Sequence, residues 1–246
     1  MRTKKVCTIA IKGFALLVVL VLAYQAMAQD SGTTYTKMAP VDQYLMADRA
    51  TEIALARSAA PKSISGEAEV QVLGRHGFET AVKGKNGFVC IVGRGWSSAA
   101  DADFWNPKVR VPICLNAAAA RTYLLRITKI TDLALAGRTL VQVNEAIAAA
   151  LARKELPPME PGAMCFMMGK QGYGGDVAPH WPSHLMFFYS DTDPAIWGAN
   201  LLGSPVIAVA DPLEHLTQFV IPVERWSDGT KAREPNLQKT HHVSGK

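Results

Sequence analysis

The chain lacks a lasting surplus of positive charge. It has 26 Lys and Arg against 21 Asp and Glu, but four of the cations lie in the first 28 residues, which carry no acid. The remaining 218 residues therefore hold 22 cations against 21 acids, a net charge of +1. Nucleic acids and anionic membranes are bound by faces that carry excess positive charge. We therefore expect no nucleic-acid partner.

The chain also lacks an apolar run long enough to span a bilayer. Its longest run, residues 14–23, has about ten residues, whereas a membrane helix needs roughly 20. The run follows a basic start and precedes Ala26-Met27-Ala28, the small-x-small pattern that signal peptidase cuts. We predict a secretory signal peptide over 1–28, cleaved after Ala28, and no permanent membrane anchor after cleavage. A retained anchor is the alternative.

Cysteine is scarce, and export would place it in an oxidising compartment, the periplasm or the extracellular medium. One of the four cysteines, Cys7, lies in the leader, so three remain. An odd number allows at most one intramolecular disulfide. Cys165 lies in the middle of an apolar segment and is expected to be an inert core thiol. Cys90 and Cys114 occupy β-like positions on either side of a long excursion, and we predict that they form the disulfide.

Familiar catalytic motifs are missing. The sequence has no Gly-x-Ser-x-Gly elbow, no Ser-x-x-Lys that begins a plausible helix, and no Walker loop. The Gly-rich segment 93–98 lacks the third glycine of a dinucleotide-binding fingerprint. Whether the protein is an enzyme is therefore left open by its motifs.

The distribution of small, polar and apolar residues predicts the domain organisation. Residues 29–40 are expected to be a flexible tether, 41–230 a single domain, and 231–246 a disordered tail. A division into two domains at the proline-rich segment 156–161 is the alternative.

Three helices are predicted. The first covers 41–59 and stops before Pro61. The second begins after an Asn116 cap and runs to about residue 136, with Gly137 just beyond its end. The third covers 139–155 and begins with a Thr139–Gln142 capping box.

The strands are predicted in two groups. Segments 68–72, 78–82 and 88–92 alternate and are joined by short turns, which indicates an antiparallel meander. A short edge strand is expected at 109–115, because Pro112 does not suit a central strand. The last third of the chain adds strands at 163–168, 185–189, 206–210 and 217–223. The expected fold class is α+β, with a largely antiparallel sheet of about six to seven strands and the three main helices packed on one side.

The connection between 163–168 and 185–189 is the most promising place for a function. Both strands are apolar on both faces, which is typical of central strands. The connection has about 15 residues and four glycines, and a loop of that length in a compact domain is uncommon unless it is functional or disordered.

This loop carries the densest polar cluster of the chain. Asp176, His180 and His184 are of the residue types that bind zinc or another transition metal. Pro182 argues against a helix that would place both imidazoles on one face, but the two could still converge in a turn. The alternative is that His180 caps the loop and His184 is a hydrogen-bonded residue at the mouth of a buried strand.

The methionines beside Cys165 are soft donors that suggest copper in an exported protein. Strand alternation, however, sends Met167 to one face and Met164 and Met168 to the other, so they cannot all meet one ion. Core packing is the favoured interpretation of these methionines.

Three segments carry a resemblance. Residues 85–90 (KNGFVC), 112–114 (PIC) and 182–189 (PSHLMFFY) resemble a group of uncharacterised exported bacterial proteins, with the likeness extending from about 45 to 225. The resemblance implies one integrated domain and a bacterial origin, and it carries over no catalytic residue. We therefore predict a binding or structural protein of the cell envelope. The alternative is a metal-dependent enzyme with its site in the 169–184 loop.

Overall fold

The computed structural model describes residues 35–97, 101–212 and 214–232. The predicted leader and its cleavage point at Ala28 lie outside the described residues, as does the tail from residue 233. Within the described part of the chain, no helix is long and apolar enough to cross a bilayer. The described part of the predicted tether is packed rather than free: Tyr35, Met38 and Ala39 lie against buried side chains.

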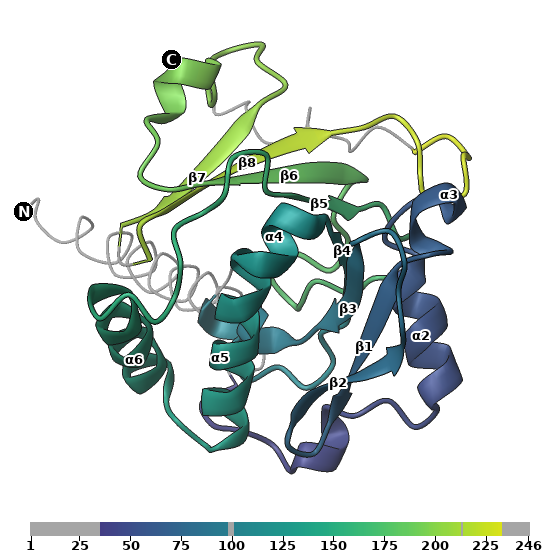
Figure 1. Cartoon of the computed structure of the whole chain (residues 1–246), viewed down its shortest axis with the longest axis vertical. Coiled ribbons are helices and arrows are strands. Elements are labelled where there is room, and N and C mark those ends of the chain that lie inside the picture. Colours follow the sequence, from purple (N-terminus) through teal and green to yellow (C-terminus); the bar gives the residue numbers. More distant parts are fainter. Residues whose placement is uncertain (1–34, 98–100, 213, 233–246) are drawn as a thin grey trace, which may run out of the picture. The chain divides into compact units, whose positions relative to one another are not determined.

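The centre of the fold is one eight-stranded sheet with the order β2-β1-β3-β4-β5-β6-β8-β7 (Figure 1). The strands are β1 (Glu69–Gly74), β2 (Gly77–Val82), β3 (Val89–Gly93), β4 (Val111–Leu115), β5 (Met164–Met167), β6 (His184–Tyr189), β7 (Ile207–Asp211) and β8 (Leu216–Pro222). The α+β class is confirmed, although the sheet has more strands than expected. Because β4 pairs with β5, the sheet runs unbroken across the segment 156–161 proposed as a domain boundary.

The predicted meander is wrong at its third strand. β3 pairs with β1 in parallel, on the side of β1 opposite β2, so the sheet is mixed. The connection from β2 passes close beside the start of β1, with Lys85 N donating to Glu67 O at 2.8 Å. A Cβ on Gly84 would lie 2.1 Å from Glu69 N, so only glycine permits this passage. A turn signal alone does not reveal which side of a strand the chain will join.

The predicted edge position of Pro112 is also wrong, since β4 lies between β3 and β5. Cys90 and Cys114 are directly paired with Cα atoms 4.0 Å apart, the close type of pair without hydrogen bonds. Pro112, two residues earlier, shares that orientation, so its nitrogen faces β5. β5 pairs with β4 only at Cys114 and Leu115, and the ladder therefore requires no N–H at Pro112.

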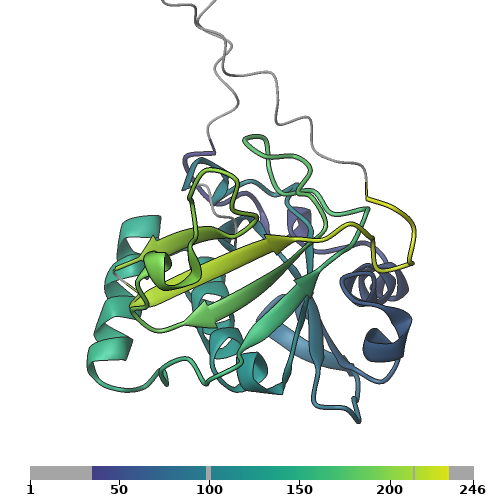
Figure 2. The ribbon, with the colours of Figure 1, turned by 90° about the horizontal axis from the view of Figure 1, so that it is seen from above.

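Helices cover both faces of the sheet rather than one (Figure 2). α2 (Arg49–Arg57) packs on β1, β3 and β4, and the short α3 (Lys62–Ser65) follows it. α4 (Ala117–Arg121) and α5 (Tyr123–Leu135) lie on the other face, with α6 (Leu140–Ala152) against α5. This arrangement produces separate apolar cores on the two faces.

Capping residues set the helix limits. The first predicted helix is shorter than expected, because residues Val41–Gln43 form only the 3-10 turn η1 and α2 begins after an Asp48 cap that accepts from Thr51 N at 2.9 Å. The second is interrupted at Thr122, whose hydroxyl donates to Ala118 O at 2.7 Å. The Asn116 cap and the Thr139–Gln142 capping box are confirmed.

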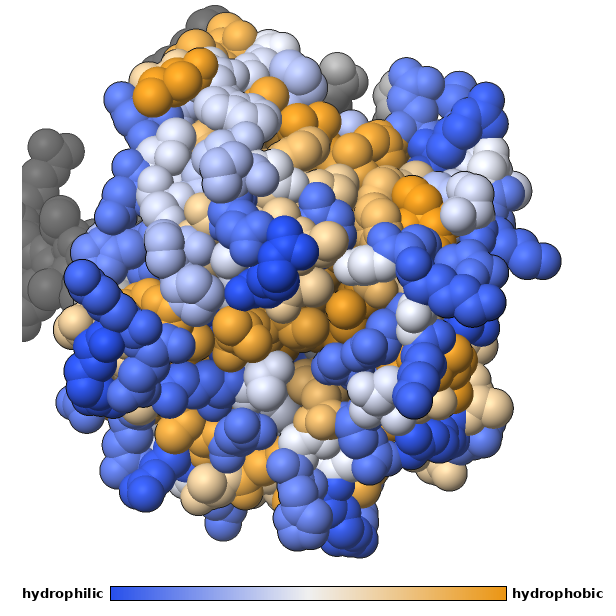
Figure 3. Space-filling model, viewed as in Figure 1, coloured by the Kyte–Doolittle hydropathy of each residue, from blue (hydrophilic) through white to orange (hydrophobic). Residues whose placement is uncertain are grey.

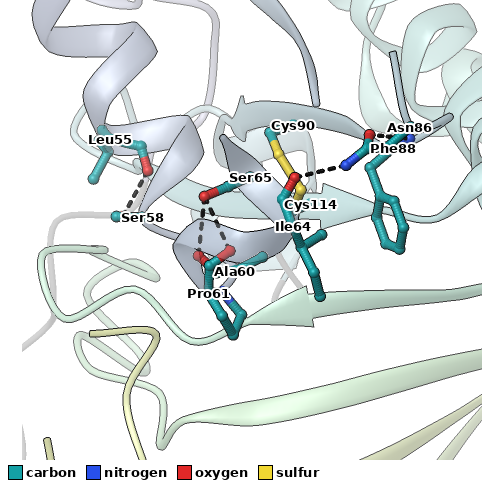
Figure 4. Close-up of a disulfide and its surroundings, with 10 residues drawn as sticks. All are labelled: Leu55, Ser58, Ala60, Pro61, Ile64, Ser65, Asn86, Phe88, Cys90 and Cys114. Carbon is teal, nitrogen blue, oxygen red and sulfur yellow. Dashed lines mark hydrogen bonds between the residues drawn. A yellow bond between two sulfur atoms is a disulfide. The ribbon is translucent and has the colours of Figure 1, made fainter. Parts of the chain in front are cut away.

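The predicted Cys90–Cys114 disulfide is present and joins β3 to β4 inside the α2-side core. Figure 4 shows it beside Ile64 of α3 and Phe88, with Asn86 donating to Ile64 O at 2.8 Å. Cys165 is buried and free, as predicted, and burial raises the pKa of its thiol. The structure places it in the core on the face of the sheet opposite the disulfide.

A buried ion pair, unforeseen from the sequence, ties α2 to β3. Arg94 and Glu52 have side chains only 0% and 3% exposed, and their N–O distance is 2.7 Å. Arg94 also donates to the carbonyls of Tyr44 and Val92, while Glu52 accepts from Leu73 N at 3.1 Å. The charges are thus held by a complete hydrogen-bond network.

The far end of the sheet is finished by the 3-10 turn η4 (Pro194–Trp197), which follows an Asp193 cap. Trp197 stacks on Phe219 of β8 with ring centroids 4.4 Å apart. Figure 3 shows apolar surface at the tip that carries η4 in Figure 1. Ile196, Leu201 and Leu202 are exposed in this segment.

Candidate functional site

A small pocket of about 140 Å³ lies where β4 begins, β5 ends and β6 begins. Its lining combines aromatic, imidazole and thioether side chains with three loop glycines. The lining residues are Val111, Pro112, Met167, Gly169, Lys170, Gly172, Tyr173, Gly174, His180, Trp181, His184 and Trp226. The loop singled out from the sequence therefore forms much of this pocket.

A buried carboxylate holds the middle of the loop. Asp103 is only 1% exposed and accepts from the backbone N–H groups of Asp176 at 2.9 Å and Val177 at 3.2 Å. Asn106 donates to the same carboxylate at 2.7 Å. Gly175 lies directly against it with φ +125°, and an added Cβ would sit 2.3 Å from an Asp103 oxygen. The loop can approach the carboxylate this closely only with glycine at that position.

The two ends of the loop are held as well. Tyr173 exchanges backbone hydrogen bonds of 2.8 and 2.9 Å with Arg110, just before β4. At the other end, Ser183 Oγ donates to Arg225 O at 2.6 Å. Lys170 forms an ion pair of 2.6 Å with Asp228. The pocket walls are therefore fixed in place by contacts from the loop to the rest of the fold.

His184 is buried at the base of the pocket, with 1% of its surface exposed. Burial lowers the pKa of its imidazole, although the Pro182 carbonyl, 2.6 Å from Nδ1, acts in the opposite direction. The Trp181 ring lies beside it, with ring centroids 5.9 Å apart. His180 is exposed and lines the same pocket. The structure thus brings both predicted histidines to one pocket.

Asp176, the third predicted metal ligand, is directed elsewhere. Its carboxylate accepts hydrogen bonds from Tyr35, at 2.9 Å, and from Tyr173. These two hydroxyls lower the pKa of Asp176. Asp176 does not line the pocket, and no group of three or more His, Cys, Asp or Glu side chains in the described ranges is placed to hold a metal. The predicted set of Asp176, His180 and His184 is therefore not assembled.

Two pocket residues were not foreseen as site residues. Met167 is directly paired with His184 across β5 and β6, which places both side chains on the same face. Trp226 comes from beyond β8, more than 40 residues after His184. The alternation of side chains along the strand predicted which face of that strand Met167 lies on. It did not predict the register of β5 against β6, which pairs Met167 with His184.

Comparison with protein-family models, with curated proteins and with solved structures gave no match. The resemblance to exported bacterial proteins therefore stays a prediction, and the functional argument rests on the pocket.

Proposed function

We propose that this chain is an exported bacterial protein of the cell envelope that binds a small ligand in the loop pocket. The observation that carries the proposal is a recess lined by aromatic and imidazole groups whose walls are already fixed by Asp103, Arg110 and Arg225. A preformed site avoids most of the entropy cost of ordering loops when a ligand binds. The Cys90–Cys114 bond supports an oxidising location.

The size of the pocket limits the ligand. At about 140 Å³ it is smaller than the roughly 300–1,000 Å³ typical of sites for drug-sized molecules and cofactors. An ion or a molecule of a few non-hydrogen atoms fits this volume. Trp181 and Trp226 offer aromatic faces, and His180 and His184 offer nitrogen atoms for such a ligand.

A metal-dependent enzyme remains the second candidate, because His180 and His184 line one pocket. This candidate lacks the predicted third ligand, since the carboxylate of Asp176 is hydrogen-bonded to two tyrosines. Elemental analysis of untagged protein separates the two: one zinc per chain, lost in a His184→Ala variant, would favour the enzyme.

The binding proposal is tested by ligand-induced stabilisation. The full gene is expressed in a bacterial host, and untagged protein is screened by thermal unfolding against zinc, nickel and copper(II) chlorides, sodium phosphate and glycine. A ligand at 100 times its Kd adds about 2.7 kcal/mol, which raises Tm by about 5–10 °C for a chain of this size.

Trp181→Ala removes one wall of the pocket and should abolish the shift, because Trp181 is already 40% exposed and its loss is tolerable to the fold. Leu202→Ala, at a fully exposed residue outside the pocket, should keep it. Native mass spectrometry of the same preparations reports any ligand acquired in the host. The proposal is contradicted if native mass spectrometry finds the chain without a ligand and no probe raises Tm. It is also contradicted if a probe raises the Tm of Trp181→Ala as much as that of wild type.

A further inference from the structure

One face of the pocket gathers donors that a search for carboxylates and thiolates overlooks. Met167 and His184 are direct partners in the β5–β6 ladder, so their side chains stand side by side with Cβ atoms about 4.5–5.5 Å apart. Both line the pocket, and His180 lines it from the loop above the strands. A thioether and two imidazoles thus line one recess.

One ring nitrogen of His184 is free to act as a ligand. A carbonyl oxygen only accepts, so the contact of 2.6 Å between Nδ1 and Pro182 O places the hydrogen of the neutral ring on Nδ1. Nε2 then keeps a lone pair, and it has no hydrogen-bond partner within the described ranges 35–97, 101–212 and 214–232. Donation from one ring nitrogen to a backbone carbonyl is how metal-binding histidines are commonly oriented. A side chain that is 99% buried and half satisfied points to a ligand.

The donor set favours a soft ion of low charge. Thioether sulfur selects Cu(I), whereas zinc sites generally add thiolate or carboxylate ligands. None of the three donors carries a negative charge, and Lys170, the cation among the described lining residues, is paired with Asp228. With no anionic ligand to offset a second positive charge, a monovalent ion suits the site better than a divalent one.

The indole of Trp181 supports the same assignment. It lines the pocket and its ring lies 5.9 Å from the His184 ring. An aromatic face within about 6 Å of a cation attracts it through the ring quadrupole. Because the Trp181 ring is next to the His184 ring, it would neighbour an ion held by His184.

We propose that Met167, His184 and His180 form a Cu(I)-binding site with Trp181 beside the ion. The proposal rests on the proposed function and names the ligand of that pocket. Met164 takes no part, because it lies one residue out of phase with Met167 and its partner in β6 is Phe187 rather than His184.

The first test titrates untagged full-chain protein with Cu(I) under anaerobic conditions against the chelator bathocuproine disulfonate. We expect one Cu(I) per chain and stoichiometric quenching of tryptophan fluorescence. Met167→Leu, which conserves volume at a half-buried position, should weaken Cu(I) binding at least about tenfold. It should leave the weaker binding of zinc unchanged, because the thioether is a soft donor.

Matched controls keep the result specific. Met164→Leu makes the same change on the other face of β5, and it should leave Cu(I) affinity unchanged. His180→Ala should weaken binding, whereas His215→Ala, at an exposed histidine outside the pocket, should not. Cys165→Ala should also bind normally, because that thiol is buried and does not line the pocket.

X-ray absorption of the copper-loaded protein gives a second readout. The spectrum should contain one sulfur neighbour together with nitrogen neighbours, and Met167→Leu should lose the sulfur. The Cu(I) site is overturned if wild type takes up no copper, if Met164→Leu weakens binding as much as Met167→Leu, or if Cys165→Ala removes the sulfur. If native mass spectrometry then finds another small ligand, the proposed binding function is still supported. If it finds the chain without any ligand, both the Cu(I) site and the binding function are contradicted.

Discussion

Arg94, which directly follows β3 in the first half of the sheet, and His184, in β6 of the second half, are both buried, but their hydrogen bonding differs. Arg94 donates from all three of its side-chain nitrogens, to Tyr44, Val92 and Glu52. The side chain of His184 has one hydrogen bond within the described residues, to Pro182, and it lines a recess. A buried polar group that is fully paired within the fold stabilises or specifies the structure, whereas one that is half paired beside a pocket has capacity for a ligand.

The largest change in the free energy of unfolding is expected from removing the charged partner of the fully hydrogen-bonded Arg94. Glu52→Ala leaves Arg94 as an unpaired buried charge, which costs about 3–5 kcal/mol in the free energy of unfolding. Glu79→Ala removes the acid from the exposed Arg49–Glu79 pair and should cost about 0–1 kcal/mol. Urea unfolding of both variants measures the difference. Equal losses of unfolding free energy in the two variants would show that the buried Arg94–Glu52 pair contributes no more to stability than an exposed pair.

The disulfide gives the next largest effect, also in the first half. Cys90 and Cys114 are 24 residues apart, and closing a loop of that length stabilises the fold by about 3 kcal/mol in the chain-entropy model. The Cys90→Ala/Cys114→Ala protein should lose about that much, while adding reductant to it should change nothing more. If the Cu(I) titration of this double variant matches that of wild type, the two regions are energetically separable. If the folded double variant no longer binds Cu(I), the two regions are energetically coupled.

The smallest effect concerns His184 and pH. Its folded-state pKa lies below the unfolded value of 6.5, so the unfolded chain binds more protons as pH falls. The stability that comes from a neutral His184 is therefore present above about pH 6.5 and is lost as pH decreases toward the folded pKa. One proton limits the slope to about 1.4 kcal/mol per pH unit.

The measurement is urea unfolding at several pH values between 5 and 8 for wild type, His184→Asn and His215→Asn. His184→Asn can still donate to Pro182 O, and it should flatten the decline below pH 6.5. His215→Asn, at an exposed position, should follow wild type. A decline that is unchanged in His184→Asn would mean that another group causes it.

Local chemistry was enough to predict much of the fold. Asn116, Thr139 and Gln142 set helix starts because caps act on backbone groups within three residues. The strands of the last third of the chain were placed to within about one residue. The errors arose where distant segments meet: β3 joined the far side of β1, and Pro112 entered a central strand because β5 stops pairing before reaching it.

The site divides in the same way. The sequence by itself determined that the 169–184 loop, with its glycines and histidines, carries the most concentrated chemistry of the chain, and that Cys90 and Cys114 pair. Only the tertiary structure decided that Asp176 turns to Tyr35 and that Met167 faces His184. The reason is physical: composition and alternation are properties of one segment, whereas strand register and the partner of a side chain depend on which distant segments pack together.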